Sequence, residues 1–140
     1  MKAKEYLKQI EILDKKINNR IRELYEIKSR TLGLKAISYD KVSVQGSGAA
    51  DKMAEQVARW IDIEEEINRL TDRLINEKHK IIGEIERLSD PRHIELLMMR
   101  YVECMTFEDI ARSMNYDVRW IYSLHGSALQ EFERVHFNSC

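Results

Sequence analysis

A long apolar stripe with helical spacing limits what residues 50–88 can form. Apolar side chains recur there at three- and four-residue steps, and the single proline of the chain lies beyond them, at Pro91. The stripe consists of Met53, Val57, Trp60, Ile63, Ile67, Leu70, Leu74, Ile81, Ile85 and Leu88. This period is typical of an amphipathic α-helix, so we predict one long coiled-coil helix over residues 51–89. Such a helix must pack against a partner to bury its stripe.

A second stripe with the same period predicts a basic amphipathic helix over residues 1–32. Its apolar positions are Ile10, Leu13, Ile17, Ile21, Leu24 and Ile27. Residues 33–50 between the two stripes contain glycines and serines without a helical period, which predicts a linker loop with a short extended patch at 41–44. Residues 1–41 carry a net charge of +5 and residues 42–90 carry −4. These opposite charges favour an antiparallel hairpin of the two helices, and the stripes also allow a homodimer through the long helices.

The stretch Ser89–Asp90–Pro91 marks the start of a C-terminal domain, which we place at residues 90–137. Asp90 can accept hydrogen bonds from the free amides of a new helix, and Pro91 suits a first helical position, where no amide hydrogen is needed. We therefore predict a helix over residues 92–102.

Two short helices with a tight corner follow. Thr106 and Asp109 have the spacing of a capping box and predict a helix over residues 106–114. Asn115 tolerates the left-handed backbone conformation that can end this helix. Asp117 can then cap a second helix that runs to Val135. The fold class predicted is all-α, namely a long helical hairpin followed by a helix-turn-helix domain.

Helical spacing separates an inward from an outward face of the second helix. We expect the inward positions to be Ile110, Met114, Tyr116, Ile121, Leu124, Ala128, Leu129 and Phe132, with Ala111 where the two helices cross. The outward positions are Arg119, Tyr122, Ser123 and Gly126. In a helix-turn-helix the second helix enters the major groove of DNA with its N-terminal part. Arg119 can bond to guanine, and Ser123 can reach a base or a phosphate. Tyr122 offers a hydroxyl to phosphate and a ring to a thymine methyl group.

A structural interpretation of the same residues is also open. The outward side chains can form a solvated face, and Gly126 can relieve crowding against the hairpin. Otherwise, the helical glycine, which costs up to about 1 kcal/mol relative to alanine, indicates close approach of another backbone. Residues 91–140 have a net charge of −2, which does not favour DNA binding.

The stretch LLMMRYVECMTFEDIARSMNYDVRWIYSLHGSAL resembles the region-4 helix-turn-helix of bacterial sigma-70 factors. The matching features are RYVECMTFEDIA before the corner, the apolar Met114, and an Arg-Trp-Ile-Tyr helix that closes with Ala128 and Leu129. Over residues 30–135 the chain also resembles small phage and prophage regulators of the ArpU type, with a YDKV…GSG linker, a long helix and a region-4-like end.

This resemblance implies a sequence-specific double-stranded DNA-binding protein that regulates transcription of phage or prophage late genes. The recognition helix would map onto Asp117–Gly126. The DNA-binding residues then expected are Arg112, Asp117, Arg119, Trp120, Tyr122, Ser123 and Gly126. The chain departs from the family pattern at Asn115, where a turn glycine is common, at Asp117, and in having fewer basic residues.

Two other functions remain open. A phage packaging protein like the small terminase subunit also combines a helix-turn-helix with helical oligomerisation, and it predicts a ring of many subunits. Alternatively, the sigma-like domain acts through protein contacts with RNA polymerase. Because a single domain with so few cations should bind DNA weakly, a homodimer that presents two recognition helices is also expected.

The sequence gives no indication of catalysis. The four histidines are scattered, no residues have metal-ligand spacing, and no glycine-rich phosphate loop is present. We therefore expect a non-enzymatic protein without a cofactor. Cys104 is expected to be a small buried core residue. No apolar run is long enough for a membrane span, and we expect a cytoplasmic protein in a bacterial host.

Overall fold

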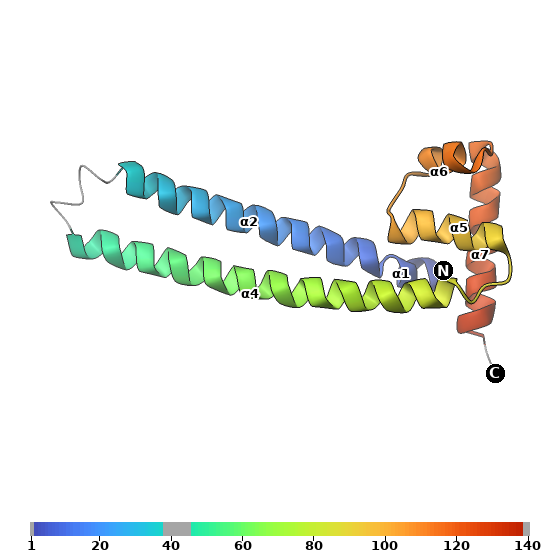
Figure 1. Cartoon of the computed structure of the whole chain (residues 1–140), viewed down its shortest axis with the longest axis horizontal. Helices are drawn as coiled ribbons and strands as arrows, with labels where there is room; N and C mark the ends of the chain where they lie inside the picture. The colour runs from blue at the N-terminus through green and yellow to red at the C-terminus, as the bar shows by residue number, and fades with distance from the viewer. Residues whose placement is uncertain (1, 38–45, 139–140) are drawn as a thin grey trace. The chain divides into compact units, whose positions relative to one another are not determined.

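The computed structural model describes residues 2–37 and 46–138, and all elements in these ranges are helical (Figure 1). In chain order they are α1 (Lys2–Leu7), α2 (Gln9–Ile37), α4 (Gly46–Ile85), α5 (Pro91–Leu97), the π-helix η1 (Met98–Val102), α6 (Phe107–Met114) and α7 (Val118–His136). The all-α fold class predicted from the sequence is thereby confirmed.

Several helix bounds differ from those expected. The loop predicted over residues 33–50 was wrong at both ends, because α2 continues to Ile37 and α4 begins at Gly46. The glycines in these two stretches are therefore helical, a conformation that costs each of them only about 1 kcal/mol relative to alanine. The extended patch expected at 41–44 lies outside the described residues. The single helix expected over 1–32 begins as two, because Lys8 forms a turn between α1 and α2.

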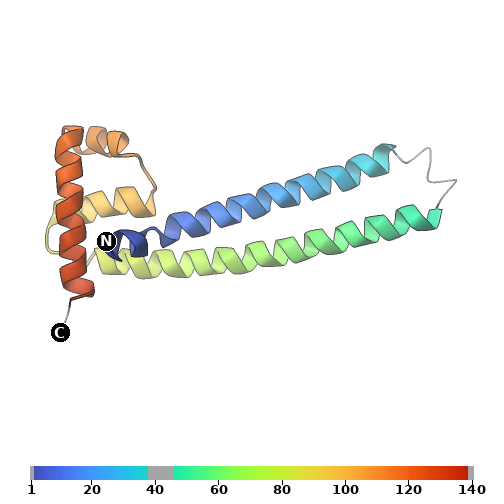
Figure 2. The ribbon, with the colours of Figure 1, turned by 180° about the vertical axis from the view of Figure 1, so that it is seen from behind.

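Residues Lys15–Arg73 form one compact unit. Within it, α2 and α4 lie side by side as an antiparallel hairpin (Figures 1 and 2). Arg20 forms an ion pair with Glu66 at 3.0 Å, and Lys28 pairs with Glu64 at 3.1 Å. The basic helix thus pairs with the acidic one, as the charge distribution predicted. Exposed ion pairs of this kind contribute little to stability, so they favour this pairing of the two helices but add little to its free energy.

Residues Met1–Asp14 and Leu74–Cys140 form the other compact unit. Its core joins the N-terminal segment to the C-terminal helices: Ala3, Leu7 and Ile10 are buried in the same cluster as Ile85 and Phe132. The amide of Ala3 donates to a carboxylate oxygen of Glu133 on α7 at 3.2 Å. This unit is therefore larger than the domain of residues 90–137 that the sequence suggested.

The start of α5 is as predicted. Asp90 is its N-cap, with a side-chain oxygen that accepts from the Arg92 amide at 2.9 Å, and Pro91 occupies the first turn. The helix expected to run regularly to Val102 instead changes to the π-helix η1 at Met98. It is followed by Cys104, which has a positive φ of 57° and is exposed. The prediction that Cys104 is a core residue was wrong.

Candidate nucleic-acid interface

The corner between α6 and α7 is built as the sequence predicted. The Thr106 side-chain oxygen accepts from the Asp109 amide at 3.1 Å and so caps α6. Asn115 ends α6 with φ 60° and ψ 42°, in the left-handed region. The amide of Tyr116 donates back to the Ala111 carbonyl at 2.9 Å, which completes a Schellman-type end. This geometry fixes the direction in which the chain enters α7.

Asp117 occupies the N-cap position of α7 but does not cap it as expected. Its backbone is extended, with φ −66° and ψ 143°, and its carbonyl accepts the first helical bond from Ile121 at 3.1 Å. Its carboxylate, however, forms no capping hydrogen bond within the described chain. The exposed negative charge at this helix end is favoured by the helix dipole alone.

The face of α7 predicted to be outward is exposed. Arg119, Tyr122 and Ser123 lie on the surface, whereas Ile121 and Leu124 are buried. The other inward positions of α7, Ala128, Leu129 and Phe132, are also buried. The three outward side chains lie within about one third of a helical turn of one another. The structure therefore places them together on one accessible face.

Gly126 continues this face and has space around it. A Cβ atom built on Gly126 would have no atom of another described residue within 4 Å, apart from its chain neighbours and the backbone of its own helix. Within its own compact unit, Gly126 therefore relieves no crowding among the described residues. The open space leaves room for another backbone to approach α7 at this position.

Arg112, on the last turn of α6, is exposed but already paired. Its guanidinium donates to the Asp109 carboxylate, three residues earlier. This guanidinium, together with the Thr106 hydroxyl, lowers the pKa of Asp109. Arg112 thus presents a partly neutralised charge, whereas Arg119 forms no ion pair among the described residues.

An aromatic cluster that sequence reasoning missed supports Tyr122. The Tyr122 ring lies 4.9 Å from the Phe107 ring, and the guanidinium of Arg100 lies 4.1 Å from the same Phe107 ring. Phe107 also contacts His125 edge-on at 5.0 Å. Tyr122 remains 51 % exposed. The Phe107 contact holds its ring, and an aromatic residue directly after the Thr106 cap was the only signal for this arrangement.

Two exposed aromatic residues flank the start of α7. Tyr116, expected to be inward, is 37 % exposed and meets the exposed Trp120 edge-on at 6.4 Å. The prediction that Tyr116 is inward was wrong because this residue directly follows the left-handed Asn115 and lies in the turn, where helical periodicity does not apply. Trp120 lies about 100° around the helix from Arg119, so it borders the Arg119 face rather than forming its centre.

Two polar pairs attach α7 to the rest of its unit. The Tyr101 hydroxyl oxygen lies 2.7 Å from Nε2 of His125, and burial lowers the pKa of His125 to about 4, with smaller effects of the Arg100 and Lys4 charges. Glu131 is buried; one of its oxygens lies 2.7 Å from Nδ1 of His93 and the other accepts from the Ser89 amide at 2.7 Å. Burial alone would raise the pKa of Glu131, but these two partners lower it below its usual value.

These features define an all-α protein with a long helical hairpin and a compact helical unit that exposes one face of its last helix. The chain belongs to the DUF1492 family, described as a protein of unknown function, whose family model matches residues 33–133. This match includes the corner and most of α7. No curated protein and no solved structure matches the chain. None of the helices in the described residues combines the length and the apolar composition that a membrane-spanning helix requires.

Proposed function

We propose that this chain binds double-stranded DNA sequence-specifically and regulates transcription, with the N-terminal part of α7 in the major groove. The observation that carries the proposal is the exposed face of Arg119, Tyr122 and Ser123 on α7. The left-handed end of α6 at Asn115 precedes it, so the short α6 and the longer α7 meet at a corner, as do the helices of helix-turn-helix proteins.

The side chains on this face have the chemistry that base readout needs. A free guanidinium such as that of Arg119 can donate two hydrogen bonds to a guanine edge. Ser123 and the hydroxyl of Tyr122 can contact bases or phosphates, and Arg112 can add a phosphate contact at the end of α6. The bare backbone at Gly126 allows a sugar-phosphate strand to approach α7 closely. Asp117 and Trp120 would lie at the border of this interface.

The biological setting is inferred from the sequence resemblance alone. The similarity to ArpU-type regulators and to sigma-70 region 4 supports control of phage or prophage late genes in the cytoplasm of a bacterial host. Because the cations are few, we propose that two copies bind together, joined through their long helices.

Selection of bound sites from random duplexes, repeated at two salt concentrations, tests this proposal. We expect an enriched motif, with affinity that falls as salt rises because phosphate contacts release counterions. Recovery of unselected sequences at both concentrations would contradict sequence-specific binding.

A second candidate function is a protein contact with RNA polymerase. The exposed Tyr116–Trp120 pair favours it, because aromatic residues are common in protein interfaces. The Asp117 carboxylate, which forms no capping hydrogen bond within the described chain, also favours it, because a negative charge there would repel DNA phosphates. Under this alternative, Trp120→Ala abolishes polymerase binding, whereas Arg119→Ala leaves promoter recognition unchanged. Co-sedimentation of the two variants with polymerase separates the two functions.

A further inference from the structure

The hairpin of residues 15–37 and 46–73 buries few apolar side chains and exposes many. Its buried apolar residues, among those described, are Ile17, Ile27 and Ile63. Its exposed large apolar residues are Ile21, Tyr25, Leu32 and Ile61, and Tyr25 is 72 % exposed. Two helices with so small a shared core gain little from pairing alone, since helices in proteins depend mainly on burial of an apolar face.

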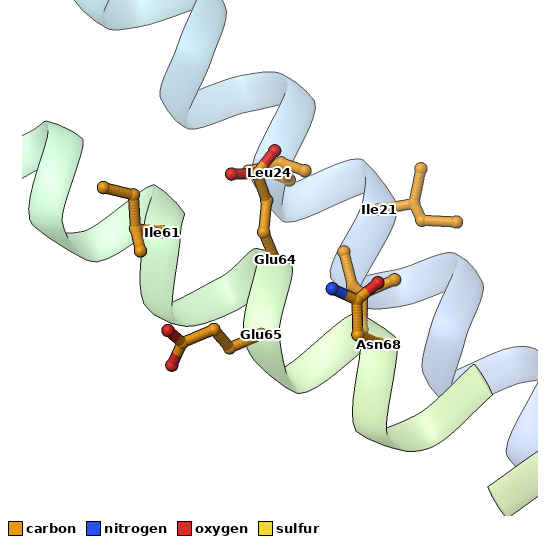
Figure 3. A pocket seen from close by; sticks show the side chains of 7 residues that line it. Ile21, Leu24, Ile61, Glu64, Glu65 and Asn68 are labelled. Atoms are coloured by element: carbon orange, nitrogen blue, oxygen red, sulfur yellow. The ribbon is translucent and has the colours of Figure 1, made fainter. Parts of the chain in front are cut away.

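The exposed apolar residues lie together. On α2, the positions of Ile21, Tyr25 and Leu32 fall within about 40° of one another around the helix axis. Between the two helices is an open groove lined by Ile21, Leu24, Ile61, Glu64, Glu65, Ile67 and Asn68 (Figure 3). Because Ile21 and Ile61 line the same groove, the exposed stripe of α2 and the exposed Ile61 of α4 belong to one side of the hairpin. We call this side, defined by Ile21, Tyr25, Leu32 and Ile61, the apolar face.

We propose that the apolar face binds the same face of a second copy of this chain, with α2 of each copy packed on α4 of the other. The charges of the hairpin select this arrangement. Residues 15–37 carry seven Lys and Arg against two Glu, a net charge of +5, and residues 46–73 carry four against seven, a net charge of −3.

Two kinds of two-fold axis can bring the face onto itself. An axis across the helices would place α2 on α2, with like charges opposed. An axis parallel to the helices places the basic α2 on the acidic α4 at both contacts, which is an isologous and charge-complementary pairing. On the groove side, Glu64 is already paired with Lys28 of its own chain, and the acidic lining residue Glu65 would meet the cationic helix of the second copy.

The parallel axis also predicts which residues meet, because rotation about it leaves each residue at its own height along the hairpin. Arg20 contacts Glu66, and Thr31 contacts Gln56. Interpolation between these two contacts places Tyr25 at about the height of residue 61 or 62. Tyr25 of one copy should therefore lie beside Ile61 of the other. This pairing deepens the homodimer of the proposed function and rests on it, but it can be tested without DNA.

Sedimentation equilibrium without DNA tests the pairing. We expect the full chain to form a dimer, and Ile21→Glu or Ile61→Glu to raise its dissociation constant at least about a hundredfold, because each would place a charged carboxylate in an apolar contact. Asn19→Glu is the matched control: it adds the same charge at an exposed residue that lies about 160° from Ile21 on α2, and it should leave the dimer intact. A wild-type monomer, a ring of many subunits, or equal effects of all three variants would overturn the proposal.

Disulfide cross-linking tests the direction of the pairing independently of these variants. In a background of Cys104→Ser and Cys140→Ser, chains with Tyr25→Cys are mixed with chains with Ile61→Cys. We expect the mixed disulfide to form in preference to either symmetric one. A predominance of the symmetric Tyr25→Cys product would show α2 on α2 and overturn the arrangement, even if the glutamate variants failed to fold.

Discussion

At the scale of single residues, Gly126 has opposite expected effects on the stability of α7 and on its proposed contact with DNA. It lies in the middle of a helix, where glycine is less favourable than alanine, and the structure leaves open space beside it. This open space leaves room for a sugar-phosphate strand to approach α7, as the proposed function requires.

We therefore predict opposite effects of Gly126→Ala on stability and binding. The free energy of unfolding, measured with urea, should rise by about 0.5–1 kcal/mol in this variant, because alanine is the better helix former. It should bind the selected duplex about 1–3 kcal/mol more weakly, because a methyl group would overpack a close contact. Gly83→Ala in α4 is the matched control, since Gly83 is also helical with open space. Equal DNA binding by both variants would rule out close approach at Gly126.

Asp117 is the residue that most opposes the proposed interface. Its carboxylate is exposed at the start of α7 and forms no capping bond within the described chain. Asp117→Asn removes the charge and keeps a side chain suited to an N-cap. We predict DNA binding tighter by about two- to tenfold at low salt, with the gain lost at high salt as screening increases. Glu86→Gln, at an exposed residue outside α6 and α7, is the control and should leave DNA affinity unchanged at both salt concentrations. An equal gain in affinity in this control would indicate a general effect of net charge.

At the scale of elements, the attachment of α7 to η1 depends on a neutral histidine. His125 lies 2.7 Å from the Tyr101 hydroxyl, and burial lowers its pKa to about 4, whereas an unfolded histidine titrates near its ordinary value of 6.5. Above pH 6.5 the ring is neutral in both states. Between pH 6.5 and 4, the unfolded state binds a proton that the folded state does not.

Stability should therefore fall as the pH drops through this interval. The total loss attributable to His125 is at most on the order of 3 kcal/mol, since one unit of pKa shift corresponds to about 1.4 kcal/mol. Urea unfolding at a series of pH values measures it. His125→Gln removes the titration and should flatten the dependence over this interval, while the carboxylates keep their own contribution below it. An unchanged profile in this variant would show that other groups cause the loss.

Local chemistry explains which elements could be predicted from the sequence. The caps at Asp90 and Thr106 and the left-handed Asn115 depend on a few neighbouring residues, and each was predicted. The π-helix η1 and the contact between Phe107 and Tyr122 depend on how α5, α6 and α7 fit together, which residue spacing does not specify. The exposed position of Tyr116 has the same origin, because helical periodicity does not apply to a turn.

At the scale of the whole molecule, the N-terminal segment completes the core of the C-terminal helices. Ala3, Leu7 and Ile10 are fully or almost fully buried among residues of α4 and α7. Sequence reasoning assigned this segment to the long hairpin, because its apolar spacing continues that of α2. Contacts between residues so far apart in the chain have no signal in local periodicity. The face of α7 could be predicted because it depends only on helical spacing.

This packing predicts that Leu7→Ala destabilises the C-terminal unit by about 2–5 kcal/mol, the usual range for a truncated leucine in a core. Ile12→Ala is the control, because Ile12 lies in the same segment but is 51 % exposed, and it should change stability by less than about 0.5 kcal/mol. Thermal unfolding followed by the Trp120 fluorescence of a Trp60→Phe background measures both. Similar melting of the two variants would contradict a structural role for the N-terminal segment.

The central claim is that Arg119 reads a base. Its most direct test is to compare the sites selected from random duplexes by the wild-type chain and by Arg119→Ala. We predict that the wild type requires a guanine at one position of the motif, and that the variant loses this requirement alone, with about 1–3 kcal/mol weaker binding to the original site. An identical motif for both chains, or no motif for the wild type, would contradict the account.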